Sequence, residues 1–425
     1  MTVMGPDRQL LGMRERFAKS LVEETLQDTP ITVIQGARQV GKSTLARAVS
    51  SERPALLLSL DTAAAYQAAK ADPEGFVRQT DDLLVIDELQ RVPELVLALK
   101  DAVEEDRRPG RFLITGSADL LELPGAPESL AGRAETVVLY GLSRGELDGH
   151  REDFVDRLLA GDWQSLRNRS SDLGRHDYLE MICAGSYPEP LARTGKRRNA
   201  WFDNYLNRIV SRDARDISHL QHIDRLPALV RLLAANNAGE LVKNRMAYDA
   251  GIPAGNVDGY VGLLETLYLV HVIPAWGNNL TGRVVNRPKA ALLDTGLAAR
   301  LANVTAEAMA PGQPGSEVAG GLFEAFVASE LRRQLVWAET DAQLFHFRDR
   351  NGLEVDLVLE DSHRMVAGIE VKAARTINAS EFRGLTGLRD KLGDRFRLGV
   401  LLYSGTQALP FGDRLWALPL SSLWT

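Results

Sequence analysis

Residues 36–43 read Gly36-Ala37-Arg38-Gln39-Val40-Gly41-Lys42-Ser43, the complete pattern G-x-x-x-x-G-K-S of a phosphate-binding loop. The apolar run 31–34 before this loop predicts a buried strand, and residues 44–49 after it predict a helix. A strand that enters a helix through such a turn points several backbone N–H groups, and the positive end of the helix, at one place. We therefore predict that the loop binds phosphate.

The residues of this P-loop predict how a nucleoside triphosphate is held. Gly36 and Gly41 let the backbone pass close to phosphate oxygens, where a Cβ atom would collide. Lys42 is expected to reach the β and γ phosphates, and the Ser43 hydroxyl is expected to ligate Mg²⁺. The loop backbone as far as Thr44 completes the predicted ATP site. The alternative is a chance match in an ordinary turn, which the strand and helix on either side make the weaker interpretation.

A second apolar run ends in two adjacent carboxylates. Residues 83–86, Leu-Leu-Val-Ile, are followed directly by Asp87 and Glu88. On a buried parallel strand these acids lie at the carboxyl-terminal edge of the sheet, where α/β proteins bind ligands. We predict that Asp87 holds Mg²⁺ through water and that Glu88 orients or deprotonates the attacking water. The alternative is a strand end with two solvated acids, but the preceding P-loop favours ATP hydrolysis.

Length and composition indicate the size and general class of the protein that carries these motifs. A chain of 425 residues is too long for one hydrophobic core and predicts several domains. The formal net charge of −7 means that any binding to nucleic acid requires a local basic patch. The single cysteine, Cys183, excludes an internal disulfide and fits a reducing compartment. Because the apolar runs are short and no signal peptide is recognisable, we expect a cytoplasmic protein without a membrane partner.

The first 150 residues alternate between strand and helix patterns, which predicts a parallel sheet covered by helices. The expected strands are residues 31–34, 55–60, 83–86, 111–115 and 136–140. The fourth of these ends at Thr115, and Gly116 and Ser117 follow it. Thr115 or Ser117 is therefore a candidate to sense the γ phosphate from the strand beside Asp87. Ser117 is equally suited to cap a helix.

Several segments together carry a family resemblance. They are residues 36–43, Asp87-Glu88-Leu89-Gln90, Thr115-Gly116-Ser117, Ser129-Leu130-Ala131-Gly132-Arg133, and further on residues 185–190, 212–216 and 293–297. In these segments the chain resembles a prokaryotic AAA+ ATPase family whose members carry an uncharacterised C-terminal region. The resemblance covers most of the chain. It implies a P-loop NTPase fold, ATP and Mg²⁺ as ligands, and a ring-forming homo-oligomer, with a hexamer as one candidate size.

The same resemblance implies that an arginine enters the nucleotide site of the neighbouring subunit. Arg133, just before the fifth expected strand, is the best candidate for this finger. A guanidinium near the γ phosphate stabilises the charge that develops during phosphoryl transfer. The alternative is an intramolecular ion pair for Arg133, and Arg91 and Arg144 are weaker candidates for the finger.

The middle of the chain predicts two further regions. Residues 151–219 are expected to be helical, with Trp201, Phe202, Tyr205 and Ile209 along one apolar face. Residues 220–310 predict a winged-helix-like domain, with three helices followed by strands at 270–273 and 283–285.

The third helix of this trio decides what the winged-helix-like domain is expected to contact. In winged-helix DNA readers the last helix enters the major groove. Here its exposed positions include Asn256, Asp258 and Glu265, which form a poor surface for phosphates. Packing against protein is therefore favoured over contact with nucleic acid.

After a linker at 311–315, residues 316–425 predict a small α/β domain with a second set of charged residues. Glu324 lies on the first helix, Asp356 lies inside the second expected strand, and Glu370-Val371-Lys372 ends the third. An acid on one strand and E-x-K on the next resemble the restriction-endonuclease-like PD-(D/E)xK fold. Period-two geometry places Glu370 and Lys372 on one face.

Two interpretations of this C-terminal set remain open. In the first, Asp356 and Glu370 hold Mg²⁺, Lys372 helps to generate hydroxide, and Glu324 supports the metal. In the second, these residues are an inherited skeleton without activity, because no Pro-Asp pair precedes Asp356.

The leading hypothesis from sequence is an oligomeric AAA+ ATPase whose hydrolysis cycle moves its C-terminal modules, with nucleic acid as a candidate target. The first alternative is an ATP-regulated, metal-dependent DNA or RNA endonuclease. The second is a signalling switch controlled by bound nucleotide.

Overall fold

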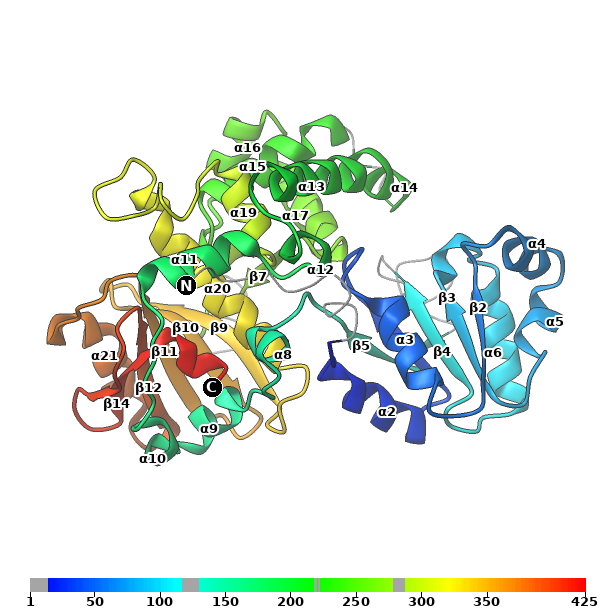
Figure 1. Cartoon of the computed structure of the whole chain (residues 1–425), viewed down its shortest axis with the longest axis horizontal. Coiled ribbons are helices and arrows are strands. Elements are labelled where there is room, and N and C mark those ends of the chain that lie inside the picture. The colour runs from blue at the N-terminus through cyan, green and yellow to red at the C-terminus, as the bar shows by residue number, and fades with distance from the viewer. Residues whose placement is uncertain (1–13, 117–129, 218–219, 221, 278–286) are drawn as a thin grey trace. The chain divides into compact units, whose positions relative to one another are not determined.

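The computed structural model describes residues 14–116, 130–217, 220, 222–277 and 287–425 (Figure 1). The chain divides into two compact units. The first contains the residues up to Leu142 together with the segments Tyr187–Ala192 and Thr266–Tyr268, and the second contains the rest. Within the described residues, no helix is both long and apolar enough to cross a membrane.

The first unit is built on a five-stranded sheet in the order β2-β3-β4-β1-β5. Every neighbouring pair of strands in it is parallel. The strands are β1 Ile31–Gln35, β2 Ala55–Ser59, β3 Leu83–Asp87, β4 Phe112–Gly116 and β5 Ala134–Val138. The predicted parallel α/β sheet is confirmed, and β4 separates the P-loop strand β1 from the acidic strand β3.

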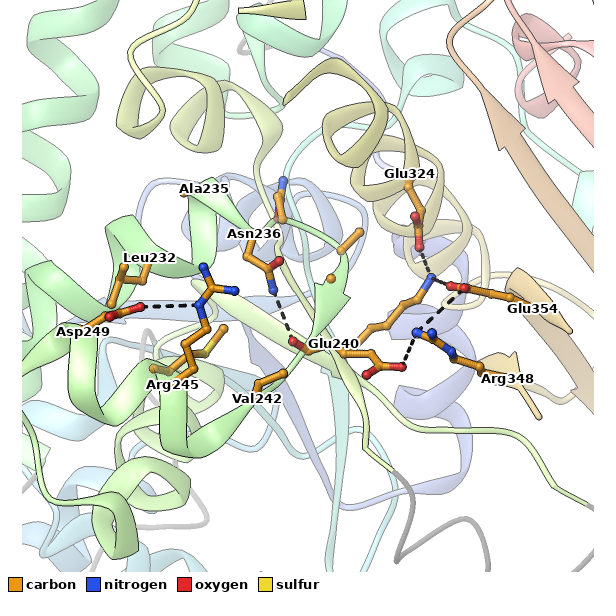
Figure 2. A pocket seen from close by; sticks show the side chains of 15 residues that line it. Leu232, Ala235, Asn236, Glu240, Val242, Arg245, Asp249, Glu324, Arg348 and Glu354 are labelled. Atoms are coloured by element: carbon orange, nitrogen blue, oxygen red, sulfur yellow. Dashed lines mark hydrogen bonds and ion pairs between the residues drawn. The ribbon is translucent and has the colours of Figure 1, made fainter. Parts of the chain in front are cut away.

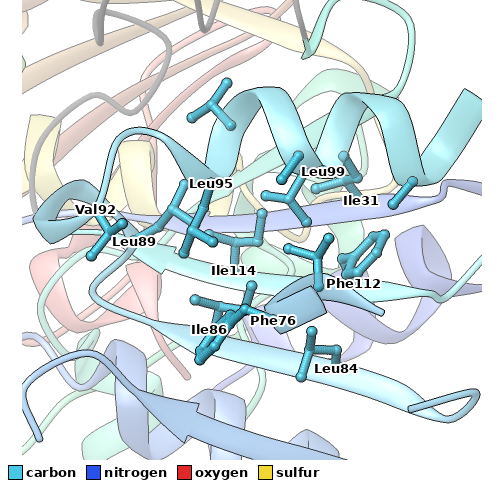
Figure 3. Close-up of a cluster of buried hydrophobic side chains, with 14 of the residues drawn as sticks. Ile31, Phe76, Leu84, Ile86, Leu89, Val92, Leu95, Leu99, Phe112 and Ile114 are labelled. Atoms are coloured by element: carbon cyan, nitrogen blue, oxygen red, sulfur yellow. The ribbon is translucent and has the colours of Figure 1, made fainter. Parts of the chain in front are cut away.

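Helices cover this sheet and form its core. They are α2 Ala18–Asp28, α3 Lys42–Ser50, α4 Ala63–Ala71, α5 Pro73–Val77 and α6 Leu95–Glu105, with a short turn η1 Leu89–Arg91. Figure 3 shows Leu95 and Leu99 of α6 facing Ile31, Phe112 and Ile114 of the sheet, and all five side chains are buried. Burial of each such side chain stabilises the folded state by about 1.5–3 kcal/mol. This core fixes β4 beside both β1 and β3.

The second unit begins with helices and continues into a small antiparallel sheet. Its helices between residues 144 and 266 include α8 Arg144–Asp148, α9 Phe154–Ala160, α10 Trp163–Leu166, α11 Arg175–Ala184, α13 Gly195–Arg208, α14 Ala214–Ile217, α15 Leu226–Ala235, α16 Lys243–Ala250 and α17 Val257–Thr266. Helix α12 Pro188–Leu191 falls within the first unit, and α19 Thr295–Leu301 follows the small sheet. Among the described residues between 154 and 217, most are helical.

The small sheet has the order β6-β8-β7, with β6 Gly239–Glu240, β7 Val270–Ile273 and β8 Lys289–Leu292. The helix at 226–235 and the strand at 270–273 lie where the sequence predicts them. The second predicted wing strand, residues 283–285, lies outside the described residues. Strand β7 pairs with β8, which the sequence analysis did not identify because Lys289-Ala-Ala-Leu is short and begins with a charge.

The C-terminal part of the second unit holds a mixed six-stranded sheet in the order β13-β14-β12-β11-β10-β9. Its strands are β9 Ala342–Arg348, β10 Glu354–Asp361, β11 Val366–Lys372, β12 Phe396–Tyr403, β13 Leu409–Pro410 and β14 Leu415–Pro419. Helix α20 Ala319–Gln334 packs against β11, and α21 Arg383–Leu392 connects β11 to the parallel strand β12. The sequence predicts strands at residues 344–347, 353–359 and 365–371, and these are present as β9, β10 and β11. Strands β12, β13 and β14 were not predicted.

Candidate nucleotide site and carboxylate cluster

The P-loop connects β1 to α3 in a backbone conformation that requires glycine. Gly36 has φ +149°, and a Cβ atom there would lie 2.1 Å from the carbonyl oxygen of Leu139. Gly41 has φ +104° and precedes the first residue of α3. Both positions are therefore closed to other residues. The loop places the first backbone N–H groups of α3 at the carboxyl end of β1, as the sequence predicts.

The Lys42 side chain lies over its own loop. Its Nζ donates hydrogen bonds to the carbonyl oxygens of Gly36, at 2.9 Å, and Ala37, at 2.8 Å. The residue is buried, so the ammonium is held among backbone dipoles rather than in bulk water. A bound phosphate would offer Lys42 stronger, charge-assisted partners in place of these two carbonyls.

Arg16 supports the P-loop from outside the motif. Its guanidinium donates to the carbonyl oxygen of Val40 at 2.8 Å and to that of Tyr140 at 2.7 Å. It thereby ties the loop to the segment that follows β5. The sequence analysis missed this residue, because an arginine ahead of α2 carries no local signal of a contact so far along the chain.

Three hydroxyl groups converge on Asp87, the last residue of β3. Ser43 Oγ and Thr115 Oγ1 donate to Asp87 Oδ1 at 2.7 and 2.5 Å, and Ser59 Oγ donates to Oδ2 at 3.2 Å. These residues come from α3, β4 and β2, so the strand order brings them together. Asp87 is buried, and the hydroxyl and carboxylate oxygens around it are the ligand types that Mg²⁺ prefers.

Glu88 turns away from the strand immediately after Asp87. Its backbone is left-handed, with φ 62°, and its N–H donates to Thr115 Oγ1 at 3.1 Å. The Gln90 amide donates to the Glu88 carboxylate. Thr115 therefore contacts both acids, which supports it over Ser117 as the polar residue of β4. Ser117 lies outside the described residues.

Arg133 lies at the opposite end of the sheet from the P-loop. It immediately precedes β5, and its carbonyl oxygen accepts a hydrogen bond from the N–H of Ile31, the first residue of β1. The five residues of β1 separate this end from the P-loop by about 16 Å. The Arg133 guanidinium pairs with Glu104 at 2.6 Å. Within its own chain, Arg133 therefore points to no part of the nucleotide site.

The two weaker finger candidates have partners of their own. Arg91 pairs with Asp61 at 2.5 Å and lies over the Tyr66 ring. Arg144 belongs to the second unit and lies over the Trp424 ring, 5.9 Å from its centroid.

In the second unit, the four residues of the predicted nuclease-like site do come together. Asp356 Oδ2 accepts the backbone N–H of Val371 at 2.9 Å, between Glu370 and Lys372. Lys372 Nζ lies 3.4 Å from Glu370 Oε2. Glu324 of α20 reaches the same cluster.

A fifth member of this cluster was not predicted. Lys289, the first residue of β8, places its Nζ 2.7 Å from Glu324 Oε1, 3.2 Å from Glu354 Oε1 and 3.9 Å from Asp356 Oδ1. Its side chain is 5% exposed. No motif spacing links Lys289 to these acids, so only the folded chain could identify it.

Burial and the charge of a neighbouring carboxylate raise the pKa values of two carboxyl groups of this cluster, Glu324 and Glu370. Burial, with the charge of Asp356, raises the pKa of Glu324 to about 8, although the Lys289 ammonium opposes this shift. Burial and the nearby Asp356 also raise the pKa of Glu370. Burial alone would lower the pKa of Lys289, but the neighbouring carboxylates outweigh it and raise that pKa. The cluster thus balances its charge with lysines and with protons.

The cluster opens onto a cavity of about 520 Å³ within the second unit. Lys289, Glu324 and Glu354 contribute to one part of its lining, and α15 and α16 supply another. Figure 2 shows the carboxylates of Glu324 and Glu354 directed into the cavity region, with Arg245 and Asp249 paired at its other side. Glu324 and Glu354 are therefore accessible from solvent through this cavity.

Cys183 shows no sign of a nucleophilic role. Burial raises the pKa of its thiol to about 12, and the nearby Glu180 adds to this shift. The thiol is therefore un-ionised near neutral pH.

Comparison with known proteins divides the chain into three matched regions. Residues 28–147 match the family described as an AAA domain, residues 175–308 match a domain of unknown function (DUF8612), and residues 319–423 match a domain of unknown function (DUF4143). The AAA match covers the P-loop, Asp87 and Glu88, and all five strands of the parallel sheet. Residues 28–147 therefore form an AAA-type, nucleotide-binding P-loop ATPase domain.

Similar proteins add little about what the chain does. Uncharacterized proteins Rv2008c of Mycobacterium tuberculosis and Mb2031c of Mycobacterium bovis are each 28% identical over 422 residues, covering 97% of this chain and 85% of theirs. Among solved structures, the Walker-type ATPase PABY2304 of Pyrococcus abyssi is 18% identical, with coverage of 70% and 95% and a TM-score of 0.37.

The Thermotoga maritima RuvB Holliday junction branch migration motor is 16% identical, with coverage of 63% and 90% and a TM-score of 0.29. At such TM-scores neither structural likeness supports an argument about this chain.

Proposed function

We propose that this protein hydrolyses ATP at the site between its P-loop and the end of β3. The observation that carries the proposal is the convergence of the Ser43, Ser59 and Thr115 hydroxyls on the buried carboxylate of Asp87. A serine at the start of the P-loop helix and an aspartate in direct contact with it are what a magnesium-bound triphosphate requires.

Each residue of the site has a distinct part in the proposal. Ser43 and Asp87 would hold Mg²⁺, which neutralises charge on the phosphates when it is bound. Lys42 exchanges the carbonyls of Gly36 and Ala37 for phosphate oxygens. Glu88 orients the attacking water and accepts its proton, and Thr115, which contacts both acids, senses the γ phosphate.

The test is ATP turnover of Glu88→Gln against the parent protein. We expect turnover to fall roughly 100-fold or more, because an amide cannot accept the proton, while ATP remains bound. Phosphate release and retention of radiolabelled ATP are measured in the same samples. Equal turnover in the two proteins would remove Glu88 from this role.

The second part of the proposal is that Arg133 completes the site of a neighbouring copy of the chain. Its place at the far end of the sheet from its own P-loop supports an action in trans. A homo-oligomer, with a hexameric ring as the candidate size, would bring the two ends together.

Complementation between two inactive variants tests this arrangement. Arg133→Ala and Glu88→Gln should each hydrolyse ATP slowly, the former by roughly 10³-fold relative to the parent. Mixing them should restore turnover, because an intact P-loop and Glu88 from one chain meet an intact Arg133 from the other. Glu104→Gln breaks the ion pair of Arg133 but keeps the arginine, so it should turn over ATP like the parent. Mixtures that assemble yet stay inactive would contradict a finger at Arg133.

Nucleic acid is the partner with the weaker support. Helix α16 carries the exposed side chains of Lys243, Arg245 and Tyr248, and Tyr248 is 87% exposed. However, Lys243 pairs with Asp258 at 2.8 Å and Arg245 with Asp249 at 3.7 Å. These aspartates offset the positive charge that phosphate binding would need. We therefore do not extend the proposal to action on nucleic acid.

A further inference from the structure

A lysine from outside the predicted motif lies in the middle of the C-terminal carboxylate cluster. The Lys289 ammonium donates a hydrogen bond to Glu324 and also forms ion pairs with Glu354 and Asp356. Figure 2 shows the Glu324 and Glu354 carboxylates directed toward the same point, although they come from α20 and β10. The shared point is where the Lys289 nitrogen lies.

A divalent cation in this cluster would compete for the same oxygens. The nuclease-like interpretation assigns Asp356, together with Glu370, to Mg²⁺ and gives Glu324 a supporting role. Magnesium binds carboxylate oxygens at about 2.0–2.1 Å. The ammonium of Lys289 already lies within contact of Glu324 and Asp356, and two cations at one buried point repel each other strongly.

The fold, rather than a mobile surface side chain, sets the position of Lys289. Strand β8 is the central strand of its sheet, and Lys289 is paired with Glu240 of β6 on one side and Ile273 of β7 on the other. Its side chain is almost fully buried. A shift of one residue in either pairing would turn the side chain to the other face of the sheet.

We propose that Lys289 takes the place of a divalent cation in this cluster, so that the native second unit neither binds metal between Glu324 and Asp356 nor cleaves phosphodiesters there. The lysine is a permanent internal counter-ion. Lys372 stays beside Glu370 and does not take over the role of Lys289. The cluster holds α20, β8 and β10 together as a structural element of the second unit.

A cavity gives access to the Lys289 side of the cluster. It has a volume of about 520 Å³ and reaches Lys289, Glu324 and Glu354. A hydrated ion therefore has a route to Glu324 and Glu354. Replacing the lysine with a neutral side chain should convert the cluster into a metal site.

The experiment measures Mn²⁺ binding to the full chain without nucleotide, from the loss of the free-ion signal in electron paramagnetic resonance. The parent should show no site that depends on Asp356. Lys289→Met keeps most of the side-chain length and removes the charge, so it should gain one Mn²⁺ site, at least ~10-fold tighter than any site in the parent. Lys289→Gln provides a second neutral variant.

Two matched variants locate the gained site. Lys289→Met combined with Asp356→Asn should lose it, because one carboxylate ligand is gone. Lys372→Met removes a lysine from the other side of Asp356 but keeps Lys289, so it should gain nothing. All six tryptophans lie in the second unit, so their fluorescence reports whether each variant of this unit is folded.

Each outcome decides the proposal. A Mn²⁺ site in the parent that disappears in Asp356→Asn would overturn it, and so would Mn²⁺-dependent nicking of plasmid DNA that disappears in the same variant. A folded Lys289→Met or Lys289→Gln variant that gains no site would also overturn it. If neither neutral variant folds, the parent and Asp356→Asn are compared instead. Equal Mn²⁺ binding by these two proteins supports the proposal, because it means that the parent has no site that depends on Asp356.

Discussion

Among the residues that the structure describes, Thr115 links the two acids of the nucleotide site. Its side chain is completely buried at the end of β4. The hydroxyl donates to Asp87 Oδ1 at 2.5 Å and accepts the N–H of Glu88 at 3.1 Å. One hydroxyl thus fixes the metal-binding acid and the left-handed turn that aims the proposed base. Both contacts depend on β4 lying next to β3.

Replacing Thr115 with valine tests this link with almost no change of shape. The loss of a charge-assisted hydrogen bond to Asp87 should lower ATP turnover about 10- to 100-fold. The first unit should also lose about 1–3 kcal/mol in free energy of unfolding, because the N–H of the half-buried Glu88 is left without its acceptor. Steady-state turnover and calorimetric unfolding measure the two effects.

Thr32→Val is the matched control. Thr32 is also completely buried in this sheet, on the neighbouring strand β1, but its hydroxyl has no hydrogen-bond partner among the described residues. Its replacement should leave turnover unchanged and should not lower stability. If both valine variants behaved alike, the Thr115 contacts would have no special role.

Among the elements, helix α21 packs closely against β10 and β11 beside the carboxylate cluster. A Cβ atom on Gly384, in the first turn of α21, would lie 1.9 Å from the Glu354 carbonyl oxygen and 2.7 Å from Glu370 Oε1. The backbone carbonyl cannot move aside as a flexible side chain could. Only glycine lets the helix pack at this distance.

Gly384→Ala should therefore destabilise the second unit by about 1–3 kcal/mol, the usual cost of overpacking. Gly262→Ala is its control, because Gly262 lies inside α17 and a Cβ there would meet nothing within 4 Å. That change should stabilise the second unit by about 0.5–1 kcal/mol through the greater helix preference of alanine. Urea unfolding followed by tryptophan fluorescence reports both. Equal effects of the two substitutions would contradict the close approach.

The sequence predicted the elements whose signal is local. The strands around the P-loop and before Asp87 are apolar runs bounded by turn residues, and their ends were found to within two residues. Strands β12, β13 and β14 were missed, although β12 is apolar, because nothing in one sequence says which later segment adds to a sheet. The sheet order that places Thr115 beside Asp87 likewise depends on packing.

The candidate sites divide in the same way. Lys42, Ser43, Asp87 and Glu88 were predicted from motif and spacing alone. In the structure Ser43, which follows Lys42 in the chain, donates a hydrogen bond to Asp87. Arg16 and Lys289 could not be predicted, because each acts across a long stretch of chain on partners that share no motif with it. The role of Lys289 changes the interpretation of four residues that the sequence did identify.

At the scale of the whole molecule, charge and division into two units constrain the account. The net charge is −7, and the cations of α16 are already paired with aspartates. These features weigh against nonspecific binding to nucleic acid. The nucleotide residues all lie in the first unit, and the carboxylate cluster lies entirely in the second. Each site can therefore be tested without disturbing the other.

The proposed function requires that the P-loop bind a magnesium-bound triphosphate. Equilibrium titration of the full chain with a fluorescent ATP analogue and Mg²⁺ tests it most directly, with Lys42→Ala as the comparison. The account predicts saturable binding of one nucleotide per chain, weakened roughly 100-fold or more in Lys42→Ala through the loss of charge-assisted contacts. A folded parent that takes up no nucleotide, or that binds it no better than Lys42→Ala, would contradict the account.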